Sequence, residues 1–290
     1  MSQTVAKGFR ELYGRLTPTR EESQAAKSHR NSIHECLEKH FGPVRLFRTG
    51  SFGNGTSIRG RSDIDYFACI SAEKLKSNSS KTLQDVQKVL STRFPNTKIR
   101  EPAVVIDFGD EASRPAEIVP AKLIKQSAEG NFIYEIANGN GDGGWLRSSP
   151  DAHNKYVRGI HKQLDRKVKP LVTFLKVWKY YCQVPIRSFY LEMRVANYAS
   201  QKRFIDYPWD LTNILKLLLD NQLEPLKDPT GISGSISPYS SEARKPDALV
   251  KLKKAFQEAE KAYRAEKAEK ISDAFHWWNL VFAKKFPSYS

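Results

Sequence analysis

The chain has 290 residues, of which 40% are apolar and 27% charged, a composition typical of one globular domain or two lobes. It contains no apolar run of the ~18 residues that a membrane span needs, and residues 1–16 lack the apolar core of a signal peptide, so we expect a cytoplasmic protein with no membrane partner. A net charge of +15 favours a polyanionic partner, and three isolated cysteines argue against a disulfide framework or a zinc cluster.

The first half of the chain alternates between helical and strand-like periodicity. Thr19 and Glu22 have the spacing of a capping box, and Gly42-Pro43 stops the helix that follows them. The elements expected up to residue 126 are, in order, helices over residues 4–16 and 20–40, strands over 44–48 and 64–71, a helix over 81–93, and strands over 103–108 and 116–120.

The second half is expected to be helical after a loop. Residues 127–150 are rich in glycine and polar side chains and are expected to join two lobes. Helices are then expected over residues 160–181, 188–200, 211–222 and about 241–286, with a turn-rich break at 228–234. We therefore expect an α+β protein with a mixed-sheet lobe over residues 1–135 and a helical lobe over 136–290, and the cleft between them as the ligand site.

Some residues of the helical half carry purely structural expectations. His153 and His161 are expected to be surface histidines rather than ligands. Large aromatic side chains near the C-terminus are expected to pack in the core: Phe275, Trp277, Trp278 and Phe282.

The most informative stretch is residues 50–67, GSFGNGTSIRGRSDIDYF. Backbone amides in the Gly50-Ser51 turn can cradle phosphate oxygens. Asp63 and Asp65 alternate along an apolar run, and the two-residue period of a strand places both carboxylates on one face, where they can share divalent metals. A phosphate cradle beside a carboxylate platform is what nucleotidyl transfer requires; the simpler interpretation is a glycine hairpin followed by a solvated edge strand.

A further pair of carboxylates follows on the next strands. If the hairpin over residues 103–120 is symmetric about Ala112, Asp107 and Glu117 face each other across it. Opposed carboxylates repel unless a positive charge lies between them, so the pair is either the rim of a metal site or a solvated edge. The sequence leaves both alternatives open.

Several motifs, taken in chain order, resemble a known family. The Gly-Ser turn, the Asp-x-Asp strand and a third acidic residue are shared by the DNA polymerase β-like nucleotidyltransferases. The segments EIVPA, FLKVWK and RSFYLE are similar to elements of the bacterial CD-NTases, relatives of cyclic GMP-AMP synthase, and span residues 117–121, 174–179 and 187–192. The resemblance runs from about Phe9 to Pro287 and implies a polymerase β-like fold with a catalytic cleft between the sheet lobe and the helical lobe.

The resemblance implies a role for three carboxylates. Asp63 and Asp65 would hold two Mg²⁺ ions, with Mn²⁺ as the alternative metal, and Glu117 would be the third carboxylate. Glutamate stands there in place of the more usual aspartate and is longer by a methylene group. Asp107 is the second candidate for this third position.

The resemblance also implies contacts to a nucleotide. Gly50 and Ser51 would bind the terminal phosphates of the donor, Lys176 would neutralise phosphate charge, and Ser188 would hydrogen-bond a phosphate oxygen. For Lys176 the alternative is a solvated helix face.

The activity that the resemblance implies is the joining of ATP, GTP and other nucleoside triphosphates into a cyclic di- or trinucleotide second messenger, with release of pyrophosphate. It further implies anti-phage defence of the CBASS type, a downstream effector reached through the product, and a regulatory ligand or protein. Two alternatives remain. The same fold could add nucleotides to RNA or protein, which the net charge favours, or the chain could be an inactive nucleotide-binding protein, for which the replacement at Glu117 is the support.

Overall fold

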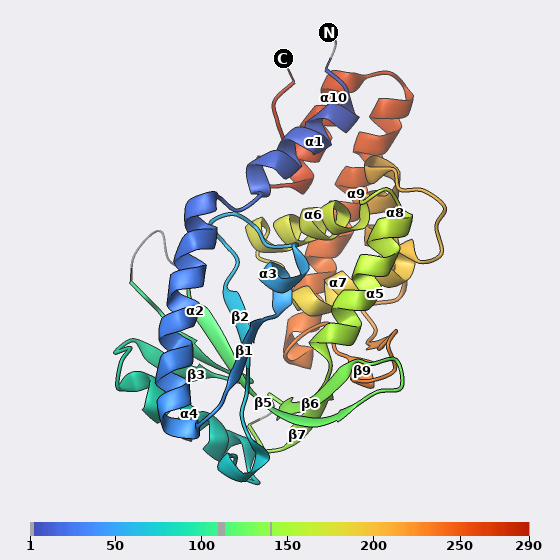
Figure 1. Ribbon diagram of the computed structural model, residues 1–290. Coiled ribbons are helices and arrows are strands. Elements are labelled where there is room, and N and C mark those ends of the chain that lie inside the picture. Colours follow the sequence, from blue (N-terminus) through green and yellow to red (C-terminus); the bar gives the residue numbers. More distant parts are fainter. Residues whose placement is uncertain (1–2, 110–113, 140, 290) are drawn as a thin grey trace. The chain divides into compact units, whose positions relative to one another are not determined.

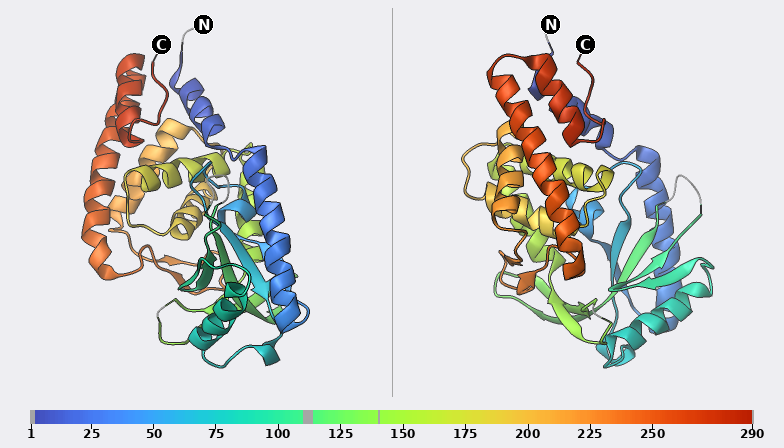
Figure 2. Two further views of the ribbon diagram at one scale, coloured as in Figure 1. Left: turned by 90° about the vertical axis from the view of Figure 1, so that its left-hand side faces the viewer. Right: turned by 180° about the vertical axis from the view of Figure 1, so that it is seen from behind.

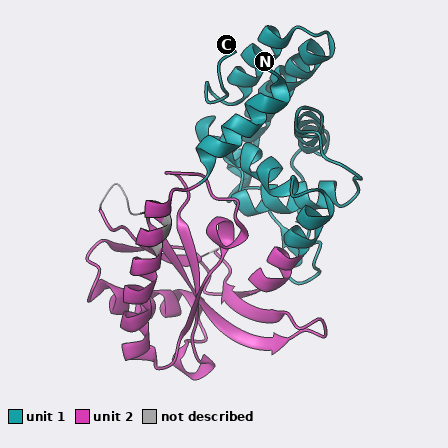
Figure 3. Ribbon diagram, turned by 45° about the horizontal axis from the view of Figure 1, so that its top comes forward, with its two compact units in different colours: residues 1–17, 156–290 teal, residues 18–155 magenta. Residues whose placement is uncertain are grey.

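The computed structural model describes residues 3–109, 114–139 and 141–289. The chain forms two compact units, which Figure 3 shows in different colours. We call residues 18–155 the sheet unit, and residues 1–17 together with 156–290 the helical unit. In the part of the chain that the structure describes, no helix combines the length and apolar character needed to cross a bilayer.

The sheet unit contains a mixed seven-stranded sheet (Figure 1). Its strands are β1 (Arg45–Arg48), β2 (Ile64–Cys69), β3 (Thr97–Arg100), β4 (Ala103–Ile106), β5 (Ala116–Gln126), β6 (Phe132–Ala137) and β7 (Trp145–Ser148). Its helices are α2 (Arg20–Phe41), the short α3 (Gly50–Asn54), the 3-10 turn η1 (Ala72–Lys74) and α4 (Ser79–Ser91).

The long strand β5 organises this sheet. The main order is β1-β2-β5-β4-β3, in which β2 and β5 are parallel and the other neighbours antiparallel. Beyond Ala121, β5 leaves β2 and pairs with β6, which in turn pairs with β7. The parallel pairing aligns β2 with the first part of β5, from Ala116 to Ala121, so the DxD motif lies next to the start of the EIVPA segment.

One face of the sheet packs against α2 and α4 and forms the core of the unit (Figures 1 and 2). Ile33 and Leu37 of α2 and Leu83 and Val86 of α4 are at most 1% exposed. The strand residues on this face include Ile64, Tyr66, Ala68, Val104, Ile106, Ala116 and Ile118. Because side chains alternate along a strand, Asp65, Val105 and Glu117 belong to the opposite face.

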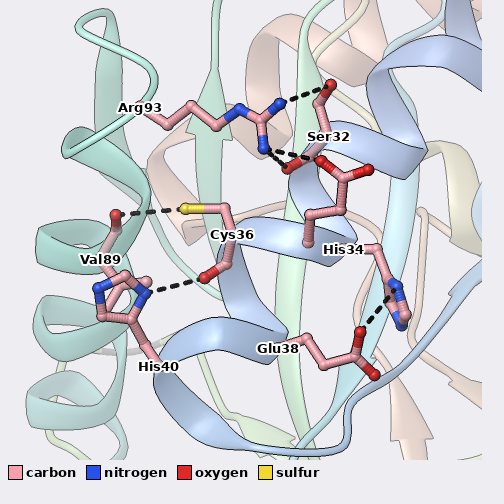
Figure 4. Close-up of polar contacts among 8 residues, drawn as sticks. Ser32, His34, Cys36, Glu38, His40, Val89 and Arg93 are labelled. Carbon is pink, nitrogen blue, oxygen red and sulfur yellow. Dashed lines mark hydrogen bonds and ion pairs between the residues drawn. The ribbon is translucent and has the colours of Figure 1, made fainter.

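Polar contacts tie α2 to α4 at the edge of this core (Figure 4). The Arg93 guanidinium, just after α4, donates to the Ser32 carbonyl at 3.2 Å and lies 3.0 Å from the Glu35 carboxylate. The Cys36 thiol donates to the Val89 carbonyl at 3.6 Å. These contacts join the interior of α2 to the C-terminal end of α4, where the Val89 carbonyl is one of the last of its helix, and they fix how α2 lies along α4.

The helical unit contains α1 (Val5–Leu16), α6 (Val168–Tyr181), α7 (Ser188–Ala199), α8 (Tyr207–Asp220), α9 (Lys245–Lys267) and α10 (Ile271–Val281). It also contains the two-stranded β8 (Leu226–Lys227) and β9 (Ser235–Ile236) and the 3-10 turn η2 (Glu242–Arg244); α5 (Pro150–Gln163) crosses the boundary between the units. The ring of Phe9 makes edge contacts with Phe174, Trp278 and Phe286 at centroid distances of 5.0, 5.0 and 5.1 Å. This aromatic cluster joins α1 to the C-terminal helices, and the Gln3 amide donates to the Ser288 carbonyl where the chain ends meet (Figure 1).

Most expected helices and strands are confirmed, including the capping box of Thr19 and Glu22. The loop expected over residues 127–150 is wrong, because strands β6 and β7 lie inside it. The expected boundary between residues 135 and 136 falls within β6, and α1 belongs to the helical unit.

Two expected helices are interrupted where the backbone turns left-handed. Asp165 and Arg166 have φ of 49° and 59° and separate α5 from α6, and Glu269 separates α9 from α10. Left-handed residues cannot continue a right-handed helix, so each of these positions ends one helix before the next begins.

Candidate active site

The Gly50-Ser51 turn is held directly against the DxD strand. Gly50 begins α3 with φ +55°, and the amide of the preceding Thr49 donates to the Asp65 carbonyl at 2.9 Å. A Cβ atom at Gly50 would overlap the carboxylate of Asp65. Glycine is therefore required here for two reasons: its backbone conformation is left-handed, and the Asp65 side chain occupies the space next to it.

The carboxylates of β2 and β5 share the face of the sheet that α2 and α4 leave free. Asp65 and Glu117 are directly opposite each other in the parallel pairing of β2 with β5. Asp63 lies one residue before β2, two positions from Asp65, on the same face. The side chains of Asp63 and Glu117 are 35% and 22% exposed, so they are accessible to a ligand while part of each is held by the protein.

A cation from the edge strand β3 bridges two of these carboxylates. The Arg100 Nη2 atom lies 2.8 Å from Asp63 Oδ2 and also contacts Glu117 Oε1. A single nitrogen therefore marks a point where oxygens from β5 and from the residue before β2 converge. Like charges in this position are tolerated because a positive group lies between them.

Asp107 is not the partner of Glu117, which corrects the symmetric hairpin expected from the sequence. The register of β4 with β5 pairs Val105 with Glu117 and Ile106 with Ala116. Asp107 lies beyond the end of β4, is exposed, and its carboxylate accepts a hydrogen bond from the Gly109 amide at 3.1 Å. The expected centre of symmetry, Ala112, lies outside the described residues.

The donor set suits a hard divalent cation. Mg²⁺ and Mn²⁺ prefer carboxylate oxygens, and two carboxylates already meet at one cationic atom here. No group of three or more Asp, Glu, His or Cys side chains among residues 3–109, 114–139 and 141–289 is drawn together closely enough to hold a metal. The site therefore offers carboxylate oxygens as metal ligands. Asp63 and Glu117 converge on one point, and Asp65 lies directly opposite Glu117 on β2.

The basic residue expected to meet phosphate from the helical unit is buried in an ion pair. Lys176 of α6 is 5% exposed, and its Nζ lies 2.9 Å from Glu192 Oε2 of α7. The alternative of a solvated helix face is thus wrong. One turn further along α6, Lys179 donates to the Ser188 hydroxyl at 2.9 Å, with both side chains partly exposed.

The two histidines of α5 are less exposed than expected. His153 is 5% exposed, and the Lys169 amide donates to Nδ1 of His161 at 3.2 Å. Burial, with the nearby charges of Lys169 and Arg166, lowers the pKa of His161 to about 4. Of the expected aromatic core, Phe275, Trp278 and Phe282 are buried, whereas Trp277 is partly exposed beneath Lys261.

Sequence reasoning missed Arg100, Lys179 and Glu192. Arg100 closes a short alternating strand, TKIR, whose residues Lys98 and Arg100 carry charge while Ile99 packs on the core. That alternation was the available signal, because it assigns both cations to the carboxylate face.

Comparison with known proteins agrees with this architecture. The model of the family described as Second Messenger Oligonucleotide or Dinucleotide Synthetase domain, SMODS, matches residues 3–160. A probable cyclic nucleotide synthase of Bacillus cereus strain VD146 is 25% identical over 174 residues, which are 60% of this chain and 52% of that protein. The chain therefore spans about half the length of this curated relative.

Solved structures with the same fold cover nearly the whole chain. CdnC of E. coli MS115-1 with ATP has a TM-score of 0.74 at 18% identity, covering 97% of this chain and 98% of that one; its complex with HORMA-deltaN has 0.72 at 16%, covering 98% and 97%. The cyclic AMP-GMP synthase DncV of Vibrio cholerae has 0.65 at 14%, covering 97% and 88%. At these identities the likeness shows the fold, an α+β fold of the polymerase β type. With the family model matching more than half of its residues, the chain belongs to the SMODS family of second messenger synthetase domains, which confirms the resemblance to bacterial CD-NTases.

Proposed function

We propose that this protein joins nucleoside triphosphates into a cyclic di- or trinucleotide and releases pyrophosphate. The observation that carries the proposal is the convergence of Asp63 and Glu117 on one cationic position, with Asp65 beside Glu117, in a chain of the SMODS family. A chain that only bound nucleotides would have no need of three carboxylates on one face of a sheet, because their mutual repulsion costs stability.

In this proposal Asp63, Asp65 and Glu117 hold divalent metal, Mg²⁺ or Mn²⁺. When bound, such ions activate an attacking hydroxyl and stabilise the charge of the triphosphate. The protein supplies the placement: Asp65 is fixed by its strand register and by the Thr49 amide, and Glu117 projects from the neighbouring strand. The side chain of Glu117 is one methylene longer than that of aspartate, and its carboxylate contacts the same Arg100 nitrogen as Asp63.

In the sheet unit, donor phosphates are proposed to bind at Gly50 and Ser51. In the helical unit, the basic group on α6 and α7 is proposed to contact phosphate. The first amides of α3 have no acceptor within the helix, which favours a phosphate oxygen as their acceptor. Ser188, which accepts a hydrogen bond from Lys179, keeps its own hydroxyl proton to donate to a phosphate. Lys176 is compensated by its buried ion pair with Glu192, so in this proposal it fixes the spacing of the two helices and Lys179 supplies the accessible positive charge.

We further propose a role in anti-phage signalling, in which the cyclic product activates a downstream effector and a protein or small ligand regulates the synthase. The complex of CdnC with HORMA-deltaN supports a protein regulator. The similarity to the Bacillus cereus protein described as a probable cyclic nucleotide synthase supports the product class.

The proposal is tested by incubating the full chain with labelled ATP, GTP, CTP and UTP, singly and in mixtures, with Mg²⁺ or Mn²⁺. Phosphatase-resistant small products are expected, and mass spectrometry would identify them. Asp63→Asn and Asp65→Asn should remove the product, while Asp107→Asn is the matched control, since this exposed carboxylate caps a turn.

Two results would contradict the proposal. Label incorporated into RNA or polypeptide would favour the alternative that the net charge of +15 suggests, a nucleotide-adding enzyme with a macromolecular acceptor. Nucleotide binding without turnover under every metal and mixture would indicate an inactive binding protein.

A further inference from the structure

The edge strand β3 presents two cations to the carboxylate face of the sheet. Within TKIR, Ile99 packs against the core formed with α2 and α4, so Lys98 and Arg100 point to the other face. The register places Lys98 opposite Val105, and Val105 opposite Glu117. Lys98 thus lies in the same row as Glu117 and Asp65, and Arg100 lies one row away.

Among the described residues, Arg100 contacts these carboxylates and Lys98 does not, although Lys98 lies in the same row as Glu117. Arg100 bridges Asp63 and Glu117, whereas Lys98 is exposed and, in the described part of the chain, has no ion pair with either. A guanidinium is planar and can approach two carboxylates through one edge, which a lysine ammonium at the end of a flexible chain does less well. The contact is therefore specific to one side chain and goes beyond the general positive charge of the strand.

We propose that Arg100 is a built-in competitor of the divalent metal: it holds Asp63 and Glu117 as their counter-ion, and a metal ion must displace it to bind. The inference rests on the proposed function in one respect, the assignment of these carboxylates as metal ligands. The competition is physical, because Nη2 lies within 2.8 Å of Asp63 Oδ2 and contacts Glu117 Oε1, so no ion can approach both oxygens from the same point. Metal binding then requires the Arg100 side chain to move toward solvent.

The side chain can make this movement at low cost. Arg100 is 55% exposed and sits on the last residue of an edge strand, so no core packing has to be broken. Exposed ion pairs are weak, so the need to displace two of them should lower the affinity for metal about three- to tenfold. Arg100 would thus hold the acidic pair together before metal arrives and set a threshold concentration for the metal.

The test is the affinity of the full chain for Mn²⁺, followed by electron paramagnetic resonance of the free ion at constant ionic strength. Three variants are compared with the wild type: Arg100→Gln, Arg100→Lys and the control Lys98→Gln. Lys98→Gln removes the same charge from the same face of the same strand, so it measures the general electrostatic effect. We expect Arg100→Gln to bind Mn²⁺ about three- to tenfold more tightly than Lys98→Gln does, with Arg100→Lys between the two.

A second readout separates competition from a structural defect. Removing the counter-ion should lower the melting temperature of Arg100→Gln before Mn²⁺ is added, and saturating Mn²⁺ should raise it by more than in the wild type. Equal or weaker Mn²⁺ binding by Arg100→Gln relative to Lys98→Gln would overturn the competition while leaving the metal site intact. If Mn²⁺ binding by the wild type is absent or unaffected by Asp63→Asn and Glu117→Gln, the assignment of the carboxylates as metal ligands fails, and this inference fails with it.

Discussion

Asp65 and Glu117 stand directly opposite each other on the parallel strands β2 and β5. The pairing joins a DxD motif to a carboxylate more than fifty positions later in the chain, through the crossover that contains α4, β3 and β4. Parallel partners on one face lie about 5 Å apart, which is close enough for two carboxylate side chains to converge on a shared ligand. The relationship supports Glu117 rather than Asp107 as the proposed third carboxylate of the site.

Replacing Glu117 and Asp107, one at a time, by the corresponding amides gives the first prediction. Glu117→Gln should lower the rate of product formation by about 10²- to 10³-fold, the usual cost of losing one preorganised charged group in an active site. Asp107→Asn should change it less than twofold, because that side chain contacts the Gly109 amide at a turn. Rates from labelled triphosphate under identical metal concentrations measure both, and a large loss in Asp107→Asn with an active Glu117→Gln would reverse the assignment.

The close approach of Gly50 to Asp65 gives the second prediction. Gly50→Ala should abolish product formation and destabilise the fold by about 1–3 kcal/mol, because alanine is strained at φ +55° and its Cβ meets the Asp65 carboxylate. Gly14→Ala is the matched control: nothing lies within 4 Å of its Cβ in α1, and the change should be neutral or stabilising. Urea unfolding with activity assays on the same samples distinguishes the two sites, and an active, stable Gly50→Ala would refute the account.

Lys176 and Lys179 of α6 are expected to have different roles, one in stability and the other in phosphate binding. Lys176→Met removes the ammonium that the buried Glu192 carboxylate pairs with and should cost about 3–5 kcal/mol of unfolding free energy. Lys179→Met removes a partly exposed cation beside Ser188 and should cost less than about 1 kcal/mol while weakening triphosphate binding. Thermal unfolding and nucleotide titration separate these effects. Unchanged nucleotide affinity in Lys179→Met would show that Lys179 does not take part in phosphate binding.

The lowered pKa of His161 predicts how the free energy of unfolding changes as the pH falls. Its pKa is lowered from 6.5 to about 4 by burial and by the charges of Lys169 and Arg166, so the folded state keeps it neutral where the unfolded state takes up a proton. Stability from this group is therefore full above about pH 6.5 and is lost as the pH falls toward 4. Protonation also breaks the hydrogen bond from the Lys169 amide.

The measurement is the difference in melting temperature between pH 7 and pH 4.5. This difference should be smaller in His161→Gln than in the wild type, because a glutamine oxygen accepts from the same amide and does not titrate. Equal acid sensitivity in both proteins would place the effect on other groups.

Much of the candidate site followed from local patterns. The capping box of Thr19 and Glu22, the glycine at position 50 and the alternation of Asp63 and Asp65 are set by residues close in sequence, where backbone conformation and side-chain period decide the outcome. The resemblance of residues 117–121 to a family element pointed to Glu117, whereas spacing alone left Asp107 opposite it.

The strand register and the counter-ion were decided by the tertiary structure. Asp107 and Glu117 have the same parity in the hairpin, so the two-residue period assigned the right face but could not say which position pairs with which. Pairing with β2 fixes β5, and β4 then aligns Val105 with Glu117. Arg100 reaches carboxylates of two separate segments only because the crossover makes β3 a strand of the same sheet, next to β4. No local sequence pattern encodes the distance between strands that are not neighbours. The sequence by itself thus determined the candidate carboxylates and the face of the sheet on which they lie, because side-chain alternation is local. Long-range strand pairing decided which of them meet and brought Arg100 to them.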